Sequence, residues 1–451
     1  MKTVRIGSGA GYAGDRLPPA VELMEKGNLD YIIFECLAER TIAIAQDDKR
    51  KDPTKGYNPL LEFRMKKVIP LCKKKGVKVI TNMGAANPAS AVEKIALMAT
   101  EMGISGLKIA AVTGDDVFGS IDKFGDYDVL ELGCKLSTIR ERAVSANAYL
   151  GSEGIVEALR AGADIVVTGR CSDPALVVAP LMHEFGWKAD DWDRMGKGIM
   201  VGHLLECAAQ SSGGYYPDPG YKDVPELWKV GFPIAEVSEN GDTVITKVEG
   251  SGGAVNVQTC KEQLVYEIHD PKCYKNPDGV ADFSNVTTTE IGKDRVAMTG
   301  ATGSQRPDTL KVMVGYSDCF VGEGQISYGG TNCLARAKLA GETVAKRLEQ
   351  DGAEIDELRI DYIGYNSLYG DHISSHICPD DSVLPEVRLR VAARTKDRAN
   401  AQLVAWETEA LYVTGPSGGA GADMSVKEVV SMASIFIPRE FIKIHVIYKE
   451  V

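Results

Sequence analysis

Acidic, basic and amide side chains follow the strand-like apolar segments of residues 1–175, close to the point where each segment ends. These residues are Glu35, Glu39, Arg40, Asn82, Arg170 and Asp173. Because α/β sheets and barrels bind ligands beyond the carboxyl ends of their strands, we expect these side chains to line one active site. A carboxyl group beside a guanidinium can move a proton while the guanidinium binds an anion. The residue types therefore predict acid/base chemistry on an anionic substrate.

The first group of candidates follows the apolar segment 31–34. Glu35 closes this segment, and Glu39 and Arg40 lie in the first turn of the helix expected after it. We expect Glu35 and Glu39 to act as catalytic carboxyls and Arg40 to bind the substrate anion. The structural alternative is a helix that simply begins with acidic residues, which interact favourably with its dipole.

Two asparagines follow the segment 77–80. Asn82 is expected to bind the substrate by orienting a carbonyl group, as amides do in oxyanion sites. Asn87 stands directly before Pro88, which is typical of a helix N-cap with proline at the first helical position. We therefore place Asn82, and not Asn87, among the site residues.

A third group follows the segment 164–167. Arg170 is expected to bind a substrate carboxylate through two parallel hydrogen bonds, and Asp173 either contacts substrate or caps the next helix. Cys171 is a candidate nucleophile or metal ligand because it lies at a helix start, where thiol pKa values fall. A buried, inert thiol is the more economical interpretation of Cys171.

His203 and Glu206 lie three residues apart, on one face of a predicted helix. This spacing suits an acid–base dyad or two metal ligands. The segment lacks a second imidazole, so we expect His203 and Glu206 to be catalytic and predict no firm metal site.

The segment Gly9–Gly14 has the pattern G-x-G-x-x-G after a strand, which is the fingerprint of dinucleotide binding. Asp15 would place a carboxylate beside the pyrophosphate, and Pro18 and Pro19 remove amide donors, so we do not expect NAD(P). The amides here are instead expected to hold a carboxylate or phosphate, with a plain tight turn as the alternative. The expected substrate-binding residues of this segment are Gly9, Gly11, Gly14, Asp15 and Arg16.

Strand and helix signals alternate through residues 1–212, which favours a mostly parallel, doubly wound sheet; a barrel is the alternative. The Gly- and Pro-rich segment 213–220 interrupts this alternation, and a hairpin pattern follows it. We predict an α/β domain over residues 1–212, carrying the strand-end loops, and an α+β domain over residues 213–451.

The composition, with 44% hydrophobic and 25% charged residues, is that of a soluble globular protein. A net charge of −12 argues against nucleic acid or an anionic membrane surface as the main partner. We find neither a signal peptide nor a transmembrane segment, and the 10 dispersed cysteines form no C-x-x-C pair. We therefore expect a cytoplasmic protein with reduced thiols.

Several motifs together resemble one known family, the acyclic terpene utilisation protein AtuA family. The residues that carry the resemblance are Gly9–Arg16, Leu37–Thr41, Gly202–Cys207, Gly213–Tyr216, Phe232–Val237 and Lys261–Pro271. The resemblance implies catabolism of acyclic terpenoid acids as CoA thioesters, or of short branched dicarboxylates. Many relatives carry an additional C-terminal domain of ferredoxin-like fold, which this chain, ending at Val451, has no room for. The resemblance thus suggests a separately encoded small ferredoxin-fold subunit and a homo- or hetero-oligomer.

The leading interpretation is a hydro-lyase acting on a branched carboxylate or acyl-CoA, with no cofactor firmly implied. An iron–sulfur cluster or a divalent metal remains open, since three of the cysteines would suffice as ligands. A noncatalytic acyl-CoA-binding or scaffold subunit is the alternative, and it predicts a pocket without residues of perturbed pKa. An NAD(P)-dependent oxidoreductase is the third candidate.

Overall fold

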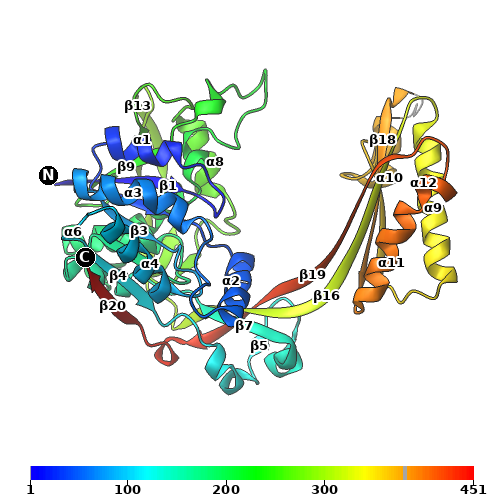
Figure 1. Cartoon of the computed structure of the whole chain (residues 1–451). Coiled ribbons are helices and arrows are strands. Elements are labelled where there is room, and N and C mark those ends of the chain that lie inside the picture. The colour runs from blue at the N-terminus through cyan, green and yellow to red at the C-terminus, as the bar shows by residue number, and fades with distance from the viewer. Residues whose placement is uncertain (1, 379–382) are drawn as a thin grey trace. The chain divides into compact units, whose positions relative to one another are not determined.

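This computed structural model describes residues 2–378 and 383–451 (Figure 1). The alternating segments at the start of the chain build the parallel centre of an open, ten-stranded sheet. The parallel strands, in spatial order, are β1 (Thr3–Ala10), β2 (Tyr31–Phe34), β3 (Lys78–Thr81), β8 (Ile165–Thr168) and β4 (Lys108–Thr113). The prediction of an α/β fold is confirmed, and the sheet is open rather than closed into a barrel.

Antiparallel strands extend this sheet at both edges. Next to β1 lie β9 (Pro233–Ser238), β10 (Thr243–Lys247), β14 (Arg295–Thr299) and β13 (Thr287–Gly292), and next to β4 lies β20 (His445–Glu450). The predicted hairpin is thus β9 and β10, but it pairs with β1 instead of starting a new domain. The first compact unit accordingly comprises residues 1–315 and 432–451, not residues 1–212.

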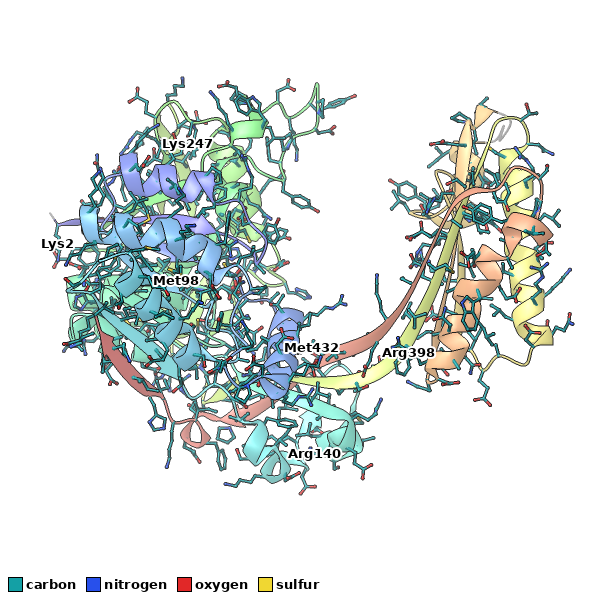
Figure 2. All side chains as sticks on the ribbon, in the orientation of Figure 1. Lys2, Met98, Arg140, Lys247, Arg398 and Met432 are labelled. Atoms are coloured by element: carbon teal, nitrogen blue, oxygen red, sulfur yellow. The ribbon has the colours of Figure 1, made fainter. Side chains whose placement is uncertain are left out.

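Helices cover both faces of the sheet. On one face α1 (Pro18–Lys26), α3 (Leu61–Lys75) and α4 (Pro88–Glu101) share a core with Ile32, Val79 and Val167. Met98 of α4, labelled in Figure 2, belongs to this core. The alternate strand residues Ile33 and Val166 are equally buried and point to the other face, as the period of a strand requires. There α5 (Glu153–Arg160), α6 (Ala175–Phe185) and α7 (Trp192–Glu206) pack against the strands.

The remaining elements of the first unit lie around this sheet. They are α2 (Glu39–Lys51), β5 (Asp128–Val129), β6 (Cys134–Lys135), β7 (Ala143–Ala148), α8 (Val257–Val265), β11 (Tyr274–Asn276), β12 (Gly279–Asp282), β15 (Thr302–Ser304) and short 3₁₀ turns. β11, β12 and β15 form a small antiparallel sheet, and β12 and β15 contact α7. The predicted N-cap is confirmed, because Asn87 accepts a hydrogen bond from the Ser90 amide at 3.4 Å.

The second compact unit comprises residues 316–431, inserted between two parts of the first. Its elements are β16 (Thr309–Gly329), α9 (Cys333–Gln350), β17 (Glu357–Ile363), α10 (Gly370–Ile377), β18 (Glu386–Thr395), α11 (Arg398–Glu409), α12 (Leu411–Thr414) and β19 (Ala420–Pro438), with β16 and β19 continuing from one unit into the other. The sheet order is β17-β18-β16-β19, and α9 and α11 both pack on β18. Apart from α10 and α12 this is the β-α-β-β-α-β arrangement of ferredoxin-like folds.

The chain therefore contains a ferredoxin-like topology of its own, as an insertion rather than an extension. The sequence did not reveal it because the two strands that enter and leave it, β16 and β19, are far apart in the chain. The separate small subunit stays a prediction. No helix in the described ranges has both the length and the apolar run needed to cross a membrane.

Candidate active site

The carboxyl ends of β2, β3 and β8 converge on a cleft within the first compact unit. Glu35 follows β2, Asn82 follows β3, and Arg170 and Asp173 lie in the loop after β8. One lobe of the cleft, with a volume of about 610 Å³, is lined by Glu35, Glu39, Arg170 and Asp173, among others. This grouping is the one predicted from the strand-end pattern, because neighbouring parallel strands end at the same edge of the sheet.

Glu35 is a buried carboxyl with 9% of its surface exposed. Its Oε1 atom accepts hydrogen bonds from the Leu37 amide (2.8 Å) and from Asn82 Nδ2 (3.0 Å). Asn82 is itself held by the Cys36 amide, which donates to its Oδ1 atom at 2.7 Å. Burial, and then the nearby Asp173 carboxylate, raise the pKa of Glu35 to about 8, although Arg170 and the two hydrogen bonds oppose this. Glu35 therefore retains its proton at neutral pH, and Oε2 is the oxygen left to carry it.

Arg170 is almost fully buried, with 1% of its surface exposed. Its guanidinium donates to the carbonyl oxygens of Leu37 and Cys171 and to Asp173 Oδ1, and it lies 4.5 Å from the centre of the Tyr149 ring. These bonds leave no free pair of N–H groups for a substrate carboxylate, which differs from the expected role of Arg170. Its positive charge instead holds Asp173 in place and opposes the rise in the pKa of Glu35.

Asp173 lines this lobe and also a second lobe of the cleft, which Tyr274, Asn276 and Lys311 line as well. Burial raises the pKa of its carboxyl, the ion pair with Arg170 lowers it, and the Glu39 carboxylate raises it again, so that the net shift is upward. Asp173 and Glu35 titrate together, because ionisation of one opposes ionisation of the other.

A second layer of buried polar groups positions Arg170. Asp115 accepts hydrogen bonds from the Arg170 amide (3.0 Å) and from Asn147 Nδ2 (2.8 Å). Burial raises the pKa of Asp115 to about 6. Asp115 follows β4 and Asn147 belongs to β7, so both strands support the loop after β8.

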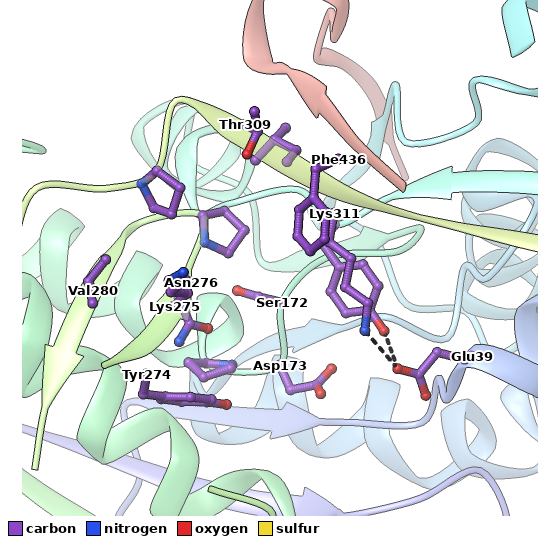
Figure 3. Close-up of a pocket in the computed structure, with 15 residues that line it drawn as sticks. Glu39, Ser172, Asp173, Tyr274, Lys275, Asn276, Val280, Thr309, Lys311 and Phe436 are labelled. Atoms are coloured by element: carbon purple, nitrogen blue, oxygen red, sulfur yellow. Dashed lines mark hydrogen bonds and ion pairs between the residues drawn. The ribbon is translucent and has the colours of Figure 1, made fainter. Parts of the chain in front are cut away.

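Glu39 lies at the start of α2 and lines both lobes; Figure 3 shows it in one of them. The Tyr149 hydroxyl donates to its Oε1 atom at 2.7 Å, and Lys311 Nζ lies 3.7 Å from the same atom. Burial acts to raise the pKa of Glu39, but the Tyr149 hydrogen bond, a backbone amide and Lys311 outweigh it and lower the pKa. Glu39 is therefore ionised at neutral pH.

His203 and Glu206 form the predicted pair, with 2.7 Å between His203 Nδ1 and Glu206 Oε1. Glu206 lines the first lobe, whereas His203 is 1% exposed and lies behind it, against the rings of Tyr274 and Phe283. Burial raises the pKa of Glu206, and His203 opposes this rise. Neither His203 Nε2 nor Glu206 Oε2 has a hydrogen-bond partner among the described residues. His203 thus positions Glu206 and does not itself face the cleft.

The glycine-rich segment after β1 is held by its own carboxylate. Asp15 Oδ2 accepts a hydrogen bond from the Gly11 amide at 2.9 Å, so this amide is not free for an anion. A Cβ atom on Gly11 would lie 2.5 Å from the Cys207 carbonyl carbon, and one on Gly9 would lie 2.6 Å from the Phe34 ring. These glycines are required for close packing. Gly11 and Asp15 still line the first lobe.

Two of the predicted anion-binding arginines lie outside the cleft. Arg16 is exposed and donates to the Trp228 carbonyl oxygen at 2.9 Å, and Arg40 is exposed on the first turn of α2. Neither lines either lobe. Their backbone positions were predicted correctly, but the direction of a long exposed side chain is not set by sequence spacing.

Cys171 is buried beside Thr168, whose Oγ1 lies 3.4 Å from its sulfur. Burial raises the pKa of this thiol to about 12, which disfavours the thiolate that a nucleophile or metal ligand requires. Within residues 2–378 and 383–451, no three His, Cys, Asp or Glu side chains are grouped as ligands for a metal ion. The described residues therefore offer no three-ligand set of the kind the iron–sulfur variant needs, and the divalent-metal variant stays a prediction.

The sequence did not single out three residues that complete the cleft. Tyr149 follows β7, Tyr274 lies in β11, and Lys311 lies in β16. Only the tertiary fold brings these three residues to Glu39 and Asp173; Tyr274 and Lys311 are labelled in Figure 3.

Comparison with known proteins gives one family. The model of the acyclic terpene utilisation family protein AtuA matches residues 4–448. No curated protein matches the chain. Among solved structures, a homoserine dehydrogenase from Thiobacillus denitrificans aligns at 10% identity over 91% of this chain and 83% of that chain, with a TM-score of 0.17. A TM-score this low carries no argument about fold or function.

Proposed function

The chain belongs to the acyclic terpene utilisation family AtuA, which implies a catabolic role, and we propose that it is a hydro-lyase acting on a branched carboxylate or acyl-CoA. One observation carries the proposal. The cleft presents two carboxyls, Glu35 and Asp173, whose pKa values are raised by burial, beside the guanidinium of Arg170. A reversible hydration needs one group that gives a proton and another that takes one, and this pair supplies both.

In the dehydration direction, the ionised Asp173 removes a proton from the carbon next to the substrate carboxyl or thioester. The electron pair of that C–H bond forms the carbon–carbon double bond, and the bond to the hydroxyl group on the next carbon breaks. Glu35 gives its proton to the departing hydroxyl group, which leaves as water. Asp173 is then protonated and Glu35 ionised, and transfer of one proton through solvent restores the starting state.

The other residues of the cleft support this step. Asn82 and the Leu37 amide fix one oxygen of Glu35, so the proton is presented on the other. Arg170 keeps Asp173 oriented and balances the charge of the pair. The oxidation state of the substrate does not change, so the step uses no nicotinamide cofactor.

The presence of carboxyls with raised pKa values favours an enzyme over a noncatalytic acyl-CoA-binding subunit. A spectrophotometric hydration assay tests the proposal, because water addition removes the absorbance of a conjugated double bond. We expect the protein to consume methylfumarate or a branched 2-enoyl-CoA, and Glu35→Gln and Asp173→Asn to reduce the rate by about 100-fold or more. Equal rates in the two variants and the unmodified protein would disprove the assignment.

A further inference from the structure

The second lobe of the cleft has a volume of about 680 Å³ and shares Glu39, Tyr149 and Asp173 with the first. We propose that this lobe binds the carboxyl or thioester end of the substrate, with Ser172 Oγ and Asn276 Nδ2 donating hydrogen bonds to its oxygen atoms. The inference rests on the proposed function, since it places the acidic carbon of the substrate beside Asp173.

Two buried donors in this lobe lack partners. Ser172 and Asn276 are each 5% exposed, and neither Ser172 Oγ nor Asn276 Nδ2 makes a hydrogen bond with a described residue. Burial raises the pKa of the nearby Tyr274 hydroxyl, and the side-chain amide of Asn276 acts against this rise. Asn276 Nδ2 nevertheless makes no hydrogen bond of normal geometry with that hydroxyl. Leaving two buried polar groups unpaired is costly, so an occupant that accepts hydrogen bonds from both would remove that cost.

The two donors come from different elements that meet at the lobe. Ser172 precedes Asp173 in the loop after β8, and Asn276 ends β11 (Figure 3). Ser172 and Asp173 are adjacent in the chain. A substrate oxygen atom that accepts a hydrogen bond from Ser172 Oγ would therefore bring the neighbouring substrate carbon toward the Asp173 carboxylate. This is the arrangement that proton removal beside a carbonyl requires.

Positive charge in the lobe fits an acyl oxygen or carboxylate. Lys275 and Lys311 line it, and Lys275 makes no ion pair with a described residue. Lys311 also forms an ion pair with Glu39, with 3.7 Å between Lys311 Nζ and Glu39 Oε1. A carboxylate would gain more than a neutral thioester carbonyl from these two lysines and from charge-assisted hydrogen bonds.

The lobe also has an apolar surface, which fits the branched carbon chain of the substrate. It consists of Pro277, Val280, Pro307, Leu310 and Phe436. A short branched chain can pack on these side chains while its carboxyl end accepts hydrogen bonds from Ser172 and Asn276, so the lobe offers the substrate both apolar and polar contacts.

Calorimetric binding tests the inference without turnover. The probes are 2-methylsuccinate, which cannot be dehydrated, and isovaleryl-CoA. We expect the unmodified protein to bind one of these probes. Ser172→Ala and Asn276→Leu should each lower the affinity for that probe, by about 3- to 10-fold if it is the thioester and by about 10-fold or more if it is the carboxylate. Asn276→Asp should weaken the carboxylate further than Asn276→Leu does, because like charges repel.

The matched control is Ser145→Ala, which removes another buried, unpartnered hydroxyl, on β7 and outside the cleft. It should bind as the unmodified protein does. The inference would be overturned if Ser172→Ala and Asn276→Leu both bound the probe as tightly as the unmodified protein does. It would also be overturned if the unmodified protein bound neither probe. Glu35→Gln should bind the probe but lose turnover. If Glu35→Gln keeps full turnover while Ser172→Ala loses binding, the acid/base assignment fails and the binding lobe stands.

Discussion

Glu35 and Asp173 lie in one cleft, where burial and then the Asp173 carboxylate raise the pKa of Glu35 to about 8. Arg170 donates a hydrogen bond to Asp173 and opposes that rise. The two carboxyls therefore act as one unit, and a change to either should be measurable at the other.

The first prediction concerns the pH dependence of turnover. Glu35 must be protonated to donate a proton, so kcat/KM should fall above about pH 8, where Glu35 ionises. Asp173→Asn removes the repulsion and should lower the pKa of Glu35, which NMR of carboxyl-labelled glutamate can follow even where turnover is lost. An unchanged Glu35 titration in Asp173→Asn would contradict the coupling.

The second prediction concerns stability. Below the pKa of Glu35 in the unfolded chain, near its usual value of 4.5, both states hold the proton; between there and about pH 8 only the folded state does. The free energy of unfolding should therefore fall as pH rises through this window, by at most about 1.4 kcal/mol per pH unit. Glu35→Gln cannot ionise and should lose this slope. Urea unfolding between pH 4 and 9 measures it, and parallel curves for the two proteins would argue against a raised pKa.

Tyr149→Phe removes the hydroxyl that donates to Glu39 but keeps the ring over Arg170. The pKa of Glu39 should rise toward the value that burial alone would give, and stability should fall by about 1 kcal/mol. Labelled-glutamate NMR and urea unfolding test both effects. Lys311→Met is the comparison, and because Lys311 is farther from Glu39, its effect on the Glu39 pKa should be smaller.

His203 and Glu206 should behave as one energetic unit. His203→Phe keeps the packing against Tyr274 and Phe283 but leaves Glu206 buried without its partner, which should cost about 1–3 kcal/mol. Replacing both residues, as His203→Phe with Glu206→Leu, should cost less than the sum of the single changes. Additive unfolding free energies would show that the 2.7 Å contact contributes nothing.

The glycines after β1 should differ in tolerance. Gly11→Ala would place Cβ 2.5 Å from backbone atoms of Cys207, so we expect a loss of about 1–3 kcal/mol or more. Gly14→Ala meets only the Tyr12 side chain, at 3.0 Å, and should be tolerated. Equal stability of the two variants, with weakened anion binding in both, would favour an anion-binding loop instead.

Part of the site was predictable because parallel strands place their carboxyl ends together. Glu35, Asn82 and Asp173 follow β2, β3 and β8, so their convergence follows from the strand pattern alone. Burial was not predictable, and it decides that Arg170 serves Asp173 and that His203 stands behind Glu206.

The fold was predictable where pairing is local. The β9–β10 hairpin follows from its turn, but its pairing with β1 bridges more than 200 residues and carries no local signal. The same holds for β16 and β19, whose pairing encloses the inserted unit of residues 316–431. Long-range pairing is selected by the packed core rather than by the turn residues.

Hydration of methylfumarate and of a branched 2-enoyl-CoA in D₂O, followed by NMR, tests the central claim most directly. We predict that the unmodified protein incorporates one deuterium on the carbon next to the carboxyl or thioester, and that Glu35→Gln and Asp173→Asn lose this incorporation while remaining folded. No incorporation from either substrate, or unchanged incorporation in both variants, would contradict acid/base catalysis by Glu35 and Asp173.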